Sequence, residues 1–326
     1  MLRYSLIKVL LISFLLIACA TTSTQAKKVY ELEGEEEGAN SLTFSPDGEF
    51  LAANYIKSAI VWDISTGQRK LTIEKDGLYL DGWDGIAFSP DGNLLAVSDG
   101  EMIELWDVRA GVEKITIGEN YQINSAVFSP DGKFIATGNS QGAIQLWDVE
   151  TGEMTSTFTI SEYQITAVDF SPDGILLAAG DKDGNLQLLN IPTGEPKVTV
   201  RAGFYGVDSI DFSPDGEHLV TANREEKTDT HVWSLTTGEK IDLITRSNTP
   251  LGNAVFSPDG KYVATGGVFH AKLWNPSKGT PEMEFGEETR NTRSIYAIAI
   301  SPDGKFIAFS DILGSKNIEI WSIETS

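Results

Sequence analysis

Hydrophobic residues follow a pattern that recurs seven times along the chain. Each copy is marked by the tetrapeptide Ser-Pro-Asp-Gly, which begins at Ser45, Ser89, Ser129, Ser171, Ser213, Ser257 and Ser301. One apolar residue stands directly before each serine and another three positions before it, as Phe128 and Ala126 stand before Ser129. Because side chains alternate between the two faces of a strand, this spacing predicts a β-strand that ends at every tetrapeptide.

Three further strands are predicted in each copy. Pro-Asp-Gly has the composition of a tight turn, and an apolar run such as 134–137 follows it. A third strand ends at one position that is Leu189 in one copy and a tryptophan in the others: Trp62, Trp106, Trp147, Trp233, Trp274 and Trp321. Turn pairs such as Thr66-Gly67 then lead into a fourth strand, for example 114–117. Seven four-stranded repeats of 40 to 44 residues indicate the blades of a β-propeller.

The repeats resemble the WD-repeat (β-transducin-like) family, and the resemblance covers residues 28–326. It implies an all-β, seven-bladed propeller of four-stranded antiparallel blades. The last copy lacks a fourth strand, while residues 29–33 precede the first tetrapeptide without a repeat of their own. We therefore expect the N-terminal strand to pair with the C-terminal blade and close the ring, which also removes an exposed sheet edge.

One feature of many WD repeats is missing from this chain. The Gly-His pair that joins a hydrogen-bond network with the tryptophan occurs in no repeat, and the three histidines share no repeat position: His218, His231 and His270. We therefore assign the six repeat tryptophans a structural role in packing between blades. Truncating a buried one to alanine is expected to cost about 3 to 5 kcal/mol.

The N-terminus has the layout of an export signal. Basic Arg3 and Lys8 are followed by an apolar run and small residues, which predicts a signal peptide over 1–18. Residues 16–19, Leu-Ile-Ala-Cys, resemble a bacterial lipobox, which implies acylation of Cys19 with palmitate-type chains and a short tether over 19–27. We therefore expect an exported lipoprotein of the cell envelope, and Ala20 after the cysteine suggests the outer membrane if the cell has one. Ordinary cleavage remains the alternative and would instead give a secreted or periplasmic protein.

Net charge and cysteine content limit the classes of partner and site that the chain can have. The net charge of -22 disfavours nucleic acid, whose phosphates require basic residues, and leaves membrane attachment to the lipid anchor alone. The single cysteine excludes an internal disulfide and a cysteine-based metal site. We expect no cofactor, no metal and a monomeric ring.

No catalytic motif is present. The chain has no nucleophile elbow, metalloprotease helix, phosphate loop or dinucleotide fingerprint. Residues 181–185, Asp-Lys-Asp-Gly-Asn, resemble the start of a calcium loop, but Pro192 stands where its glutamate belongs, so a hairpin turn is favoured. No catalytic residue is assigned.

Aromatic residues recur in the loops that join successive blades. Tyr121, Tyr163 and Tyr205 each stand eight residues before a repeat serine, which predicts an arc on the face that commonly binds partners in WD-repeat propellers. Nearby loops contribute Phe204, Tyr79 and Trp83. Aromatics of this kind often anchor interfaces, although they also cover the ends of inner strands.

Three functions remain open on the sequence alone. The first is a non-catalytic scaffold at the bacterial cell envelope that binds a protein or peptide through loops on one face. The alternative is a propeller enzyme, a hydrolase or lyase, with acidic residues around the central channel; it predicts perturbed carboxylates or a bound metal. The third is a structural component of a larger envelope complex, which predicts a broad apolar patch.

Overall fold

All the regular secondary structure in the described residues is β-strand. The computed structural model describes residues 26–36, 38–75, 85–118, 122–203, 206–223, 228–247, 253–267, 270–286, 295–311 and 316–323. Within these ranges, no helix has the length and apolar character needed to cross a membrane. The strands form seven four-stranded antiparallel sheets, as the repeats predict.

Six of the sheets are built from consecutive strands. The first three are β2 (Ser41–Phe44), β3 (Phe50–Asn54), β4 (Ser58–Asp63) and β5 (Gln68–Glu74); β6 (Ile86–Phe88), β7 (Leu94–Ser98), β8 (Met102–Asp107) and β9 (Val112–Gly118); and β10 (Ile123–Phe128), β11 (Phe134–Asn139), β12 (Ala143–Asp148) and β13 (Met154–Thr159). The next three are β14 (Ile165–Phe170), β15 (Leu176–Asp181), β16 (Asn185–Asn190) and β17 (Glu195–Arg201); β18 (Ser209–Phe212), β19 (His218–Ala222), β20 (Thr228–Ser234) and β21 (Lys240–Ser247); and β22 (Ala254–Phe256), β23 (Val263–Thr265), β24 (Ala271–Asn275) and β25 (Thr280–Phe285).

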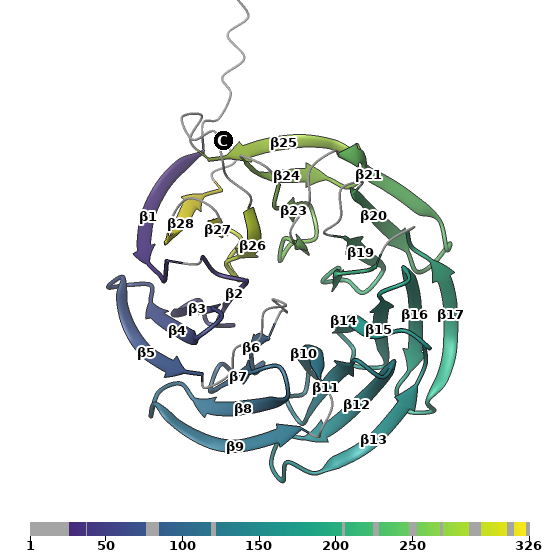
Figure 1. Cartoon of the computed structure of the whole chain (residues 1–326). Helices are drawn as coiled ribbons and strands as arrows, with labels where there is room; N and C mark the ends of the chain where they lie inside the picture. Colours follow the sequence, from purple (N-terminus) through teal and green to yellow (C-terminus); the bar gives the residue numbers. More distant parts are fainter. Residues whose placement is uncertain are drawn as a thin grey trace, which may run out of the picture.

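The seventh sheet joins the two ends of the chain. Its order is β26 (Ile295–Ile300), β27 (Phe306–Asp311), β28 (Asn317–Ser322) and then β1 (Lys27–Glu33) on the outside. β1 runs antiparallel to β28, with Leu32 opposite Ile318. Figure 1 shows the purple N-terminal strand beside the yellow C-terminal blade. The predicted closure of the ring is confirmed.

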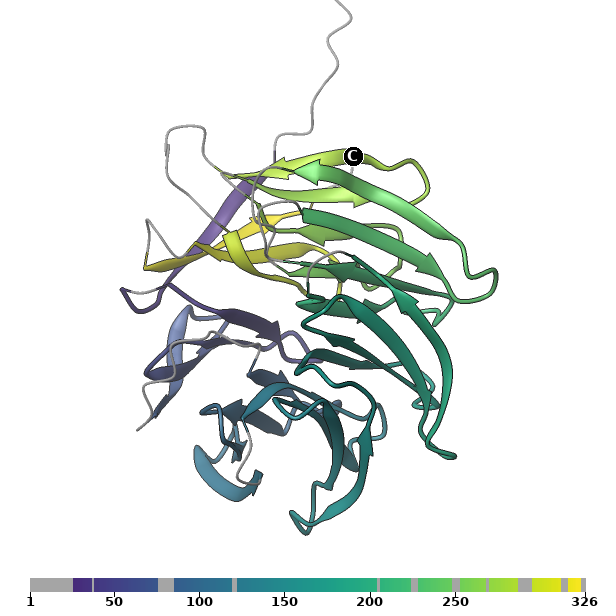
Figure 2. The same cartoon turned by 45° about the vertical axis from the view of Figure 1, so that its right-hand side comes forward.

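The blades are arranged around one axis (Figures 1 and 2), and Figure 1 shows the labelled first strands, β2, β6, β10, β14 and β26, innermost in their blades. Each inner strand contacts the inner strand of its neighbour, from β2 through β6, β10, β14, β18, β22 and β26 back to β2. The core lies between the blades. Trp147 of β12, for example, packs with Ile103, Leu105 and Ile117 of the preceding blade.

The Ser-Pro-Asp-Gly turns form a second ring of contacts on one face. In all seven turns the serine hydroxyl donates to the aspartate carboxylate over 2.5 to 2.7 Å and accepts the N–H five residues after the serine over 2.8 to 3.0 Å. Each turn glycine has φ between 69° and 72°, which favours glycine. In six turns the glycine approaches the proline of the preceding blade. At the seventh, around Gly304, a cavity of about 300 Å³ separates it from Pro258.

Candidate functional site

The loops that join successive blades share one face with the hairpins between second and third strands. We call this the loop face; the Ser-Pro-Asp-Gly turns lie on the opposite face because the strands alternate in direction. The two kinds of loop meet where Ser161, which follows β13, donates its hydroxyl to Asp181 Oδ2 at the end of β15 over 2.6 Å. This contact links one blade to the next on the loop face.

Tyr163 lies at this junction with its side chain turned to solvent. It is 48% exposed, and its backbone N–H donates to Ser161 Oγ over 3.0 Å. Beside it is a cavity of about 330 Å³ lined by Ile160, Ser161, Glu162, Tyr163, Ile165, Ala179, Asp181, Asn185, Gln187 and Thr199. We call it the Tyr163 cavity. Of the aromatic residues proposed to bind a partner, Tyr163 is thus placed on the loop face at the mouth of a cavity.

The hairpin between β15 and β16 holds one wall of the cavity in place. Asp181 is 3% exposed, and its carboxylate accepts four hydrogen bonds: from Ser161 Oγ, from the N–H groups of Asp183 and Asn185, and from Asn185 Nδ2. The segment is a hairpin turn, as the sequence favours over a calcium loop.

The remaining predicted partner residues, Tyr79, Trp83, Tyr121, Phe204 and Tyr205, lie outside the described residues, as does Cys19. The arc as a whole therefore stays a prediction. Sequence reasoning found Tyr163 but missed the cavity, because part of its lining comes from strands more than a dozen residues further along the chain: Ala179, Asp181 and Gln187.

The repeat tryptophans all lie between blades, and each packs on the blade that precedes its own. The indole N–H groups of five of them have partners that the sequence analysis did not foresee. Trp147, Trp233 and Trp274 donate to a threonine hydroxyl of the second strand, namely Thr137, Thr221 and Thr265, over 2.9 to 3.0 Å. Trp106 and Trp321 donate to Glu104 and Glu319, two residues earlier on their own strands.

Two carboxylates on inner strands have perturbed pKa values. Asp169 of β14 accepts the N–H groups of Phe170 and Phe212 over 2.9 and 2.8 Å, and Asp211 of β18 accepts that of Phe256 over 2.6 Å. Burial raises the pKa of Asp169 to about 7, against the effect of these hydrogen bonds. Burial and then the nearby charge of Asp169 raise the pKa of Asp211. Each carboxylate thus links its inner strand to that of the next blade.

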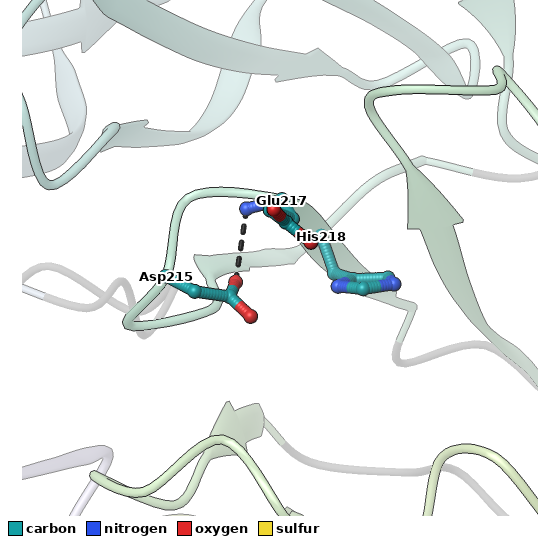
Figure 3. A group of neighbouring side chains, drawn as sticks. All are labelled: Asp215, Glu217 and His218. Carbon is teal, nitrogen blue, oxygen red and sulfur yellow. Dashed lines mark hydrogen bonds between the residues drawn. The ribbon is translucent and has the colours of Figure 1, made fainter.

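A group of possible metal ligands lies on the opposite, turn-bearing face. Figure 3 shows Asp215, Glu217 and His218, whose ligand atoms lie within 4.8 Å of one another. One oxygen of Asp215 is already engaged by Ser213 Oγ and by the Glu217 N–H. Asp215 and Glu217 are exposed, and exposed acidic groups of this kind are common without an ion. We assign no metal to them.

Known proteins match parts of the chain. The family described as "WD domain, G-beta repeat" matches residues 26–63, and "Anaphase-promoting complex subunit 4 WD40 domain" matches residues 86–171. The periodic tryptophan protein 2 homolog of Dictyostelium discoideum is 27% identical over 181 residues, 55% of this chain and 19% of that protein. WD repeat-containing protein SL1-17 of Schistosoma mansoni is 30% identical over 139 residues, 42% of this chain and 32% of that protein.

The chain thus spans less than a third of the length of each of these relatives. The two family models match WD-repeat sequences within the part of the chain that folds into the seven blades described above. The two family matches, the two relatives and the seven-bladed ring together support the WD-repeat propeller family for this chain.

Proposed function

We propose that the protein is a non-catalytic scaffold that binds a protein or peptide partner through its loop face. WD-repeat propellers typically act as protein-interaction scaffolds. The observation that supports the choice of face is the Tyr163 cavity, where an exposed aromatic ring borders a hollow held by a hydrogen-bonded hairpin. Rigid scaffolds commonly display their binding residues on loops in this way.

The proposal places the protein at the bacterial cell envelope. Residues 1–18 would direct export, Cys19 would receive lipid, and 19–27 would tether the propeller, with the outer membrane as destination where the cell has one. The alternative is a secreted or periplasmic protein. The sequence around Cys19 supports this setting. Replacing Cys19 by serine is expected to move the protein from the membrane fraction to the soluble fraction and to abolish incorporation of labelled palmitate.

The binding face is tested by crosslinking in the native envelope. A variant with Tyr121, Tyr163 and Tyr205 all changed to alanine is expected to lose a specific protein that the unmodified chain captures. The matched control is Tyr30→Ala, because Tyr30 of β1 is 46% exposed but lies on the outer strand of the closing blade. Equal capture by the triple variant and the unmodified chain would place the interface elsewhere.

One observation favours the enzymatic alternative, namely the pair of perturbed carboxylates, Asp169 and Asp211. Both carboxylates accept hydrogen bonds from backbone N–H groups of their own blade or the following one. This structural role explains why the two aspartates are buried there, without any substrate. The scaffold therefore remains the better-supported function. The enzyme hypothesis predicts that Asp211→Asn abolishes a hydrolase or lyase activity, whereas the scaffold predicts unchanged capture of the partner.

A further inference from the structure

All the charged residues that line the Tyr163 cavity are acidic. Its charged residues are Glu162 and Asp181, and neither lysine nor arginine lines it. Among the described residues, neither of these two carboxylates forms an ion pair, whereas Asp183 on the same hairpin is paired with Arg201. A group that enters the cavity therefore meets negative charge on a protein that is itself strongly acidic.

Gln187, one of the lining residues, has an unused hydrogen-bond acceptor. Gln187 Nε2 donates to Thr199 Oγ1 over 3.0 Å, which orients the amide. Its Oε1 atom is buried and has no partner in the described structure. A buried acceptor left unpaired is unfavourable, so a bound group that donates a hydrogen bond here would gain from satisfying it.

Apolar surface completes the cavity. Of its lining residues, Ile165 and Ala179 are buried, Ile160 is partly buried, and Tyr163 is exposed. A volume of about 330 Å³ accommodates a long side chain rather than a folded segment. Aliphatic carbons fit the apolar floor, and an aromatic face attracts a cation.

We propose that the Tyr163 cavity binds the side chain of an arginine presented by the partner protein. This inference rests on the proposed scaffold function and adds the chemistry by which the partner is recognised. The guanidinium group carries five N–H donors in a plane, so it can pair with Glu162 while it stacks on Tyr163, and it can donate to Gln187 Oε1 once that side chain turns to expose the atom. Lysine has the charge but lacks the planar fork.

The test uses short peptides of known sequence and the full chain. Saturation-transfer NMR is recorded with acetyl-Gly-Arg-Gly-amide and with analogues in which citrulline, lysine or glutamate replaces arginine. We expect transfer to the arginine side chain to exceed that to citrulline and glutamate at least fivefold, with lysine in between. Equal signals for arginine and citrulline, or a preference for glutamate, would overturn the proposal, because charge and N–H donation would then not select the ligand.

Two variants locate the binding. Tyr163→Ala and Gln187→Met, the second chosen for its similar length, are each expected to lower the arginine signal at least threefold, while Tyr30→Ala leaves it unchanged. Melting temperatures verify that each variant is folded. A signal that persists in both cavity variants places arginine elsewhere and refutes the site. If the cavity variants lose arginine binding but still capture the envelope partner, the partner is not recognised through an arginine in this cavity. That result would refute this inference and leave the scaffold function standing.

Discussion

At the scale of single residues, threonine and glutamate replace the histidine network that many WD repeats use. The most enclosed example is the Trp147 indole, 3% exposed, whose N–H donates to the fully buried Thr137 hydroxyl. Buried N–H groups need such partners, because the low exposure of Trp147 and Thr137 separates this N–H from solvent. The repeat therefore keeps its tryptophan and satisfies it by a different route.

Thr137→Val tests this contact, because valine keeps the shape of the side chain and removes the acceptor. Leaving the Trp147 N–H unpaired is expected to lower the free energy of unfolding by about 1 to 3 kcal/mol, measured by urea denaturation. Thr265→Val is the matched control: Trp274 is only half-buried, so water can replace the lost acceptor and the loss is smaller. Equal losses in the two variants would contradict the role of burial.

The raised pKa values of Asp169 and Asp211 predict that their contribution to stability falls as pH rises, whereas a carboxylate with a lowered pKa contributes more as pH rises. Since the pKa of Asp169 is raised in the folded state, the fold binds a proton that the unfolded chain has lost, and this stabilisation fades as pH rises from about 4 through about 7. Asp211→Asn removes one charge and keeps a carbonyl oxygen for the Phe256 N–H. We expect it to raise the unfolding free energy at pH 8 by on the order of 1 kcal/mol, and less at pH 5.

Asp169→Asn serves as the contrasting variant. Both oxygens of Asp169 accept backbone N–H groups, so the amide nitrogen of asparagine would face a donor. This variant is expected to be less stable than the unmodified chain at both pH values. If Asp169→Asn and Asp211→Asn have the same melting temperatures across the pH range, the difference in hydrogen bonding between the two aspartates does not determine their effect on stability.

At the scale of elements, the ring depends on one strand from the opposite end of the chain. β1 covers β28, and Leu32 is 3% exposed within the cluster that joins the last blade to the first. Without β1, the edge of β28 and this cluster would face solvent. Exposed strand edges promote association between chains.

Deleting residues 28–34 is therefore expected to give an insoluble or aggregated protein, as observed by size-exclusion chromatography. Val29→Thr is the control, because Val29 is 38% exposed and its substitution leaves the pairing of β1 intact. A soluble monomer with unchanged melting temperature after the deletion would show that the ring does not need this strand.

At the scale of the whole molecule, the acidic turns act together. Hydrogen bonds from the turn serines hold down the pKa of Asp91, Asp131, Asp173 and Asp215, that of Asp131 to about 2. For Asp47, Asp259 and Asp303 burial is the largest single effect and raises the pKa, but the serine hydrogen bond outweighs it together with further hydrogen bonds and nearby positive charge. These carboxylates favour the fold when ionised.

The turns predict cooperative loss of stability in acid. A group whose folded pKa is lowered stabilises the fold above its unfolded pKa of about 4, and this contribution disappears as pH falls through the folded value. The midpoint of urea unfolding is expected to drop steeply between about pH 4 and pH 2. Asp131→Asn should flatten that drop slightly; an identical profile would mean that its ionisation does not contribute.

The sequence by itself determined the blades, their number and the closure of the ring. Ser-Pro-Asp-Gly, the alternating apolar positions before it and the tryptophan after the third strand are local signals, and local signals set strands and turns. The tertiary structure alone decided which side chains meet across blades. Asp169 accepts the N–H of Phe212 from the next blade, and Ser161 at the end of one blade donates to Asp181 of the following one, through packing that no spacing within one repeat encodes.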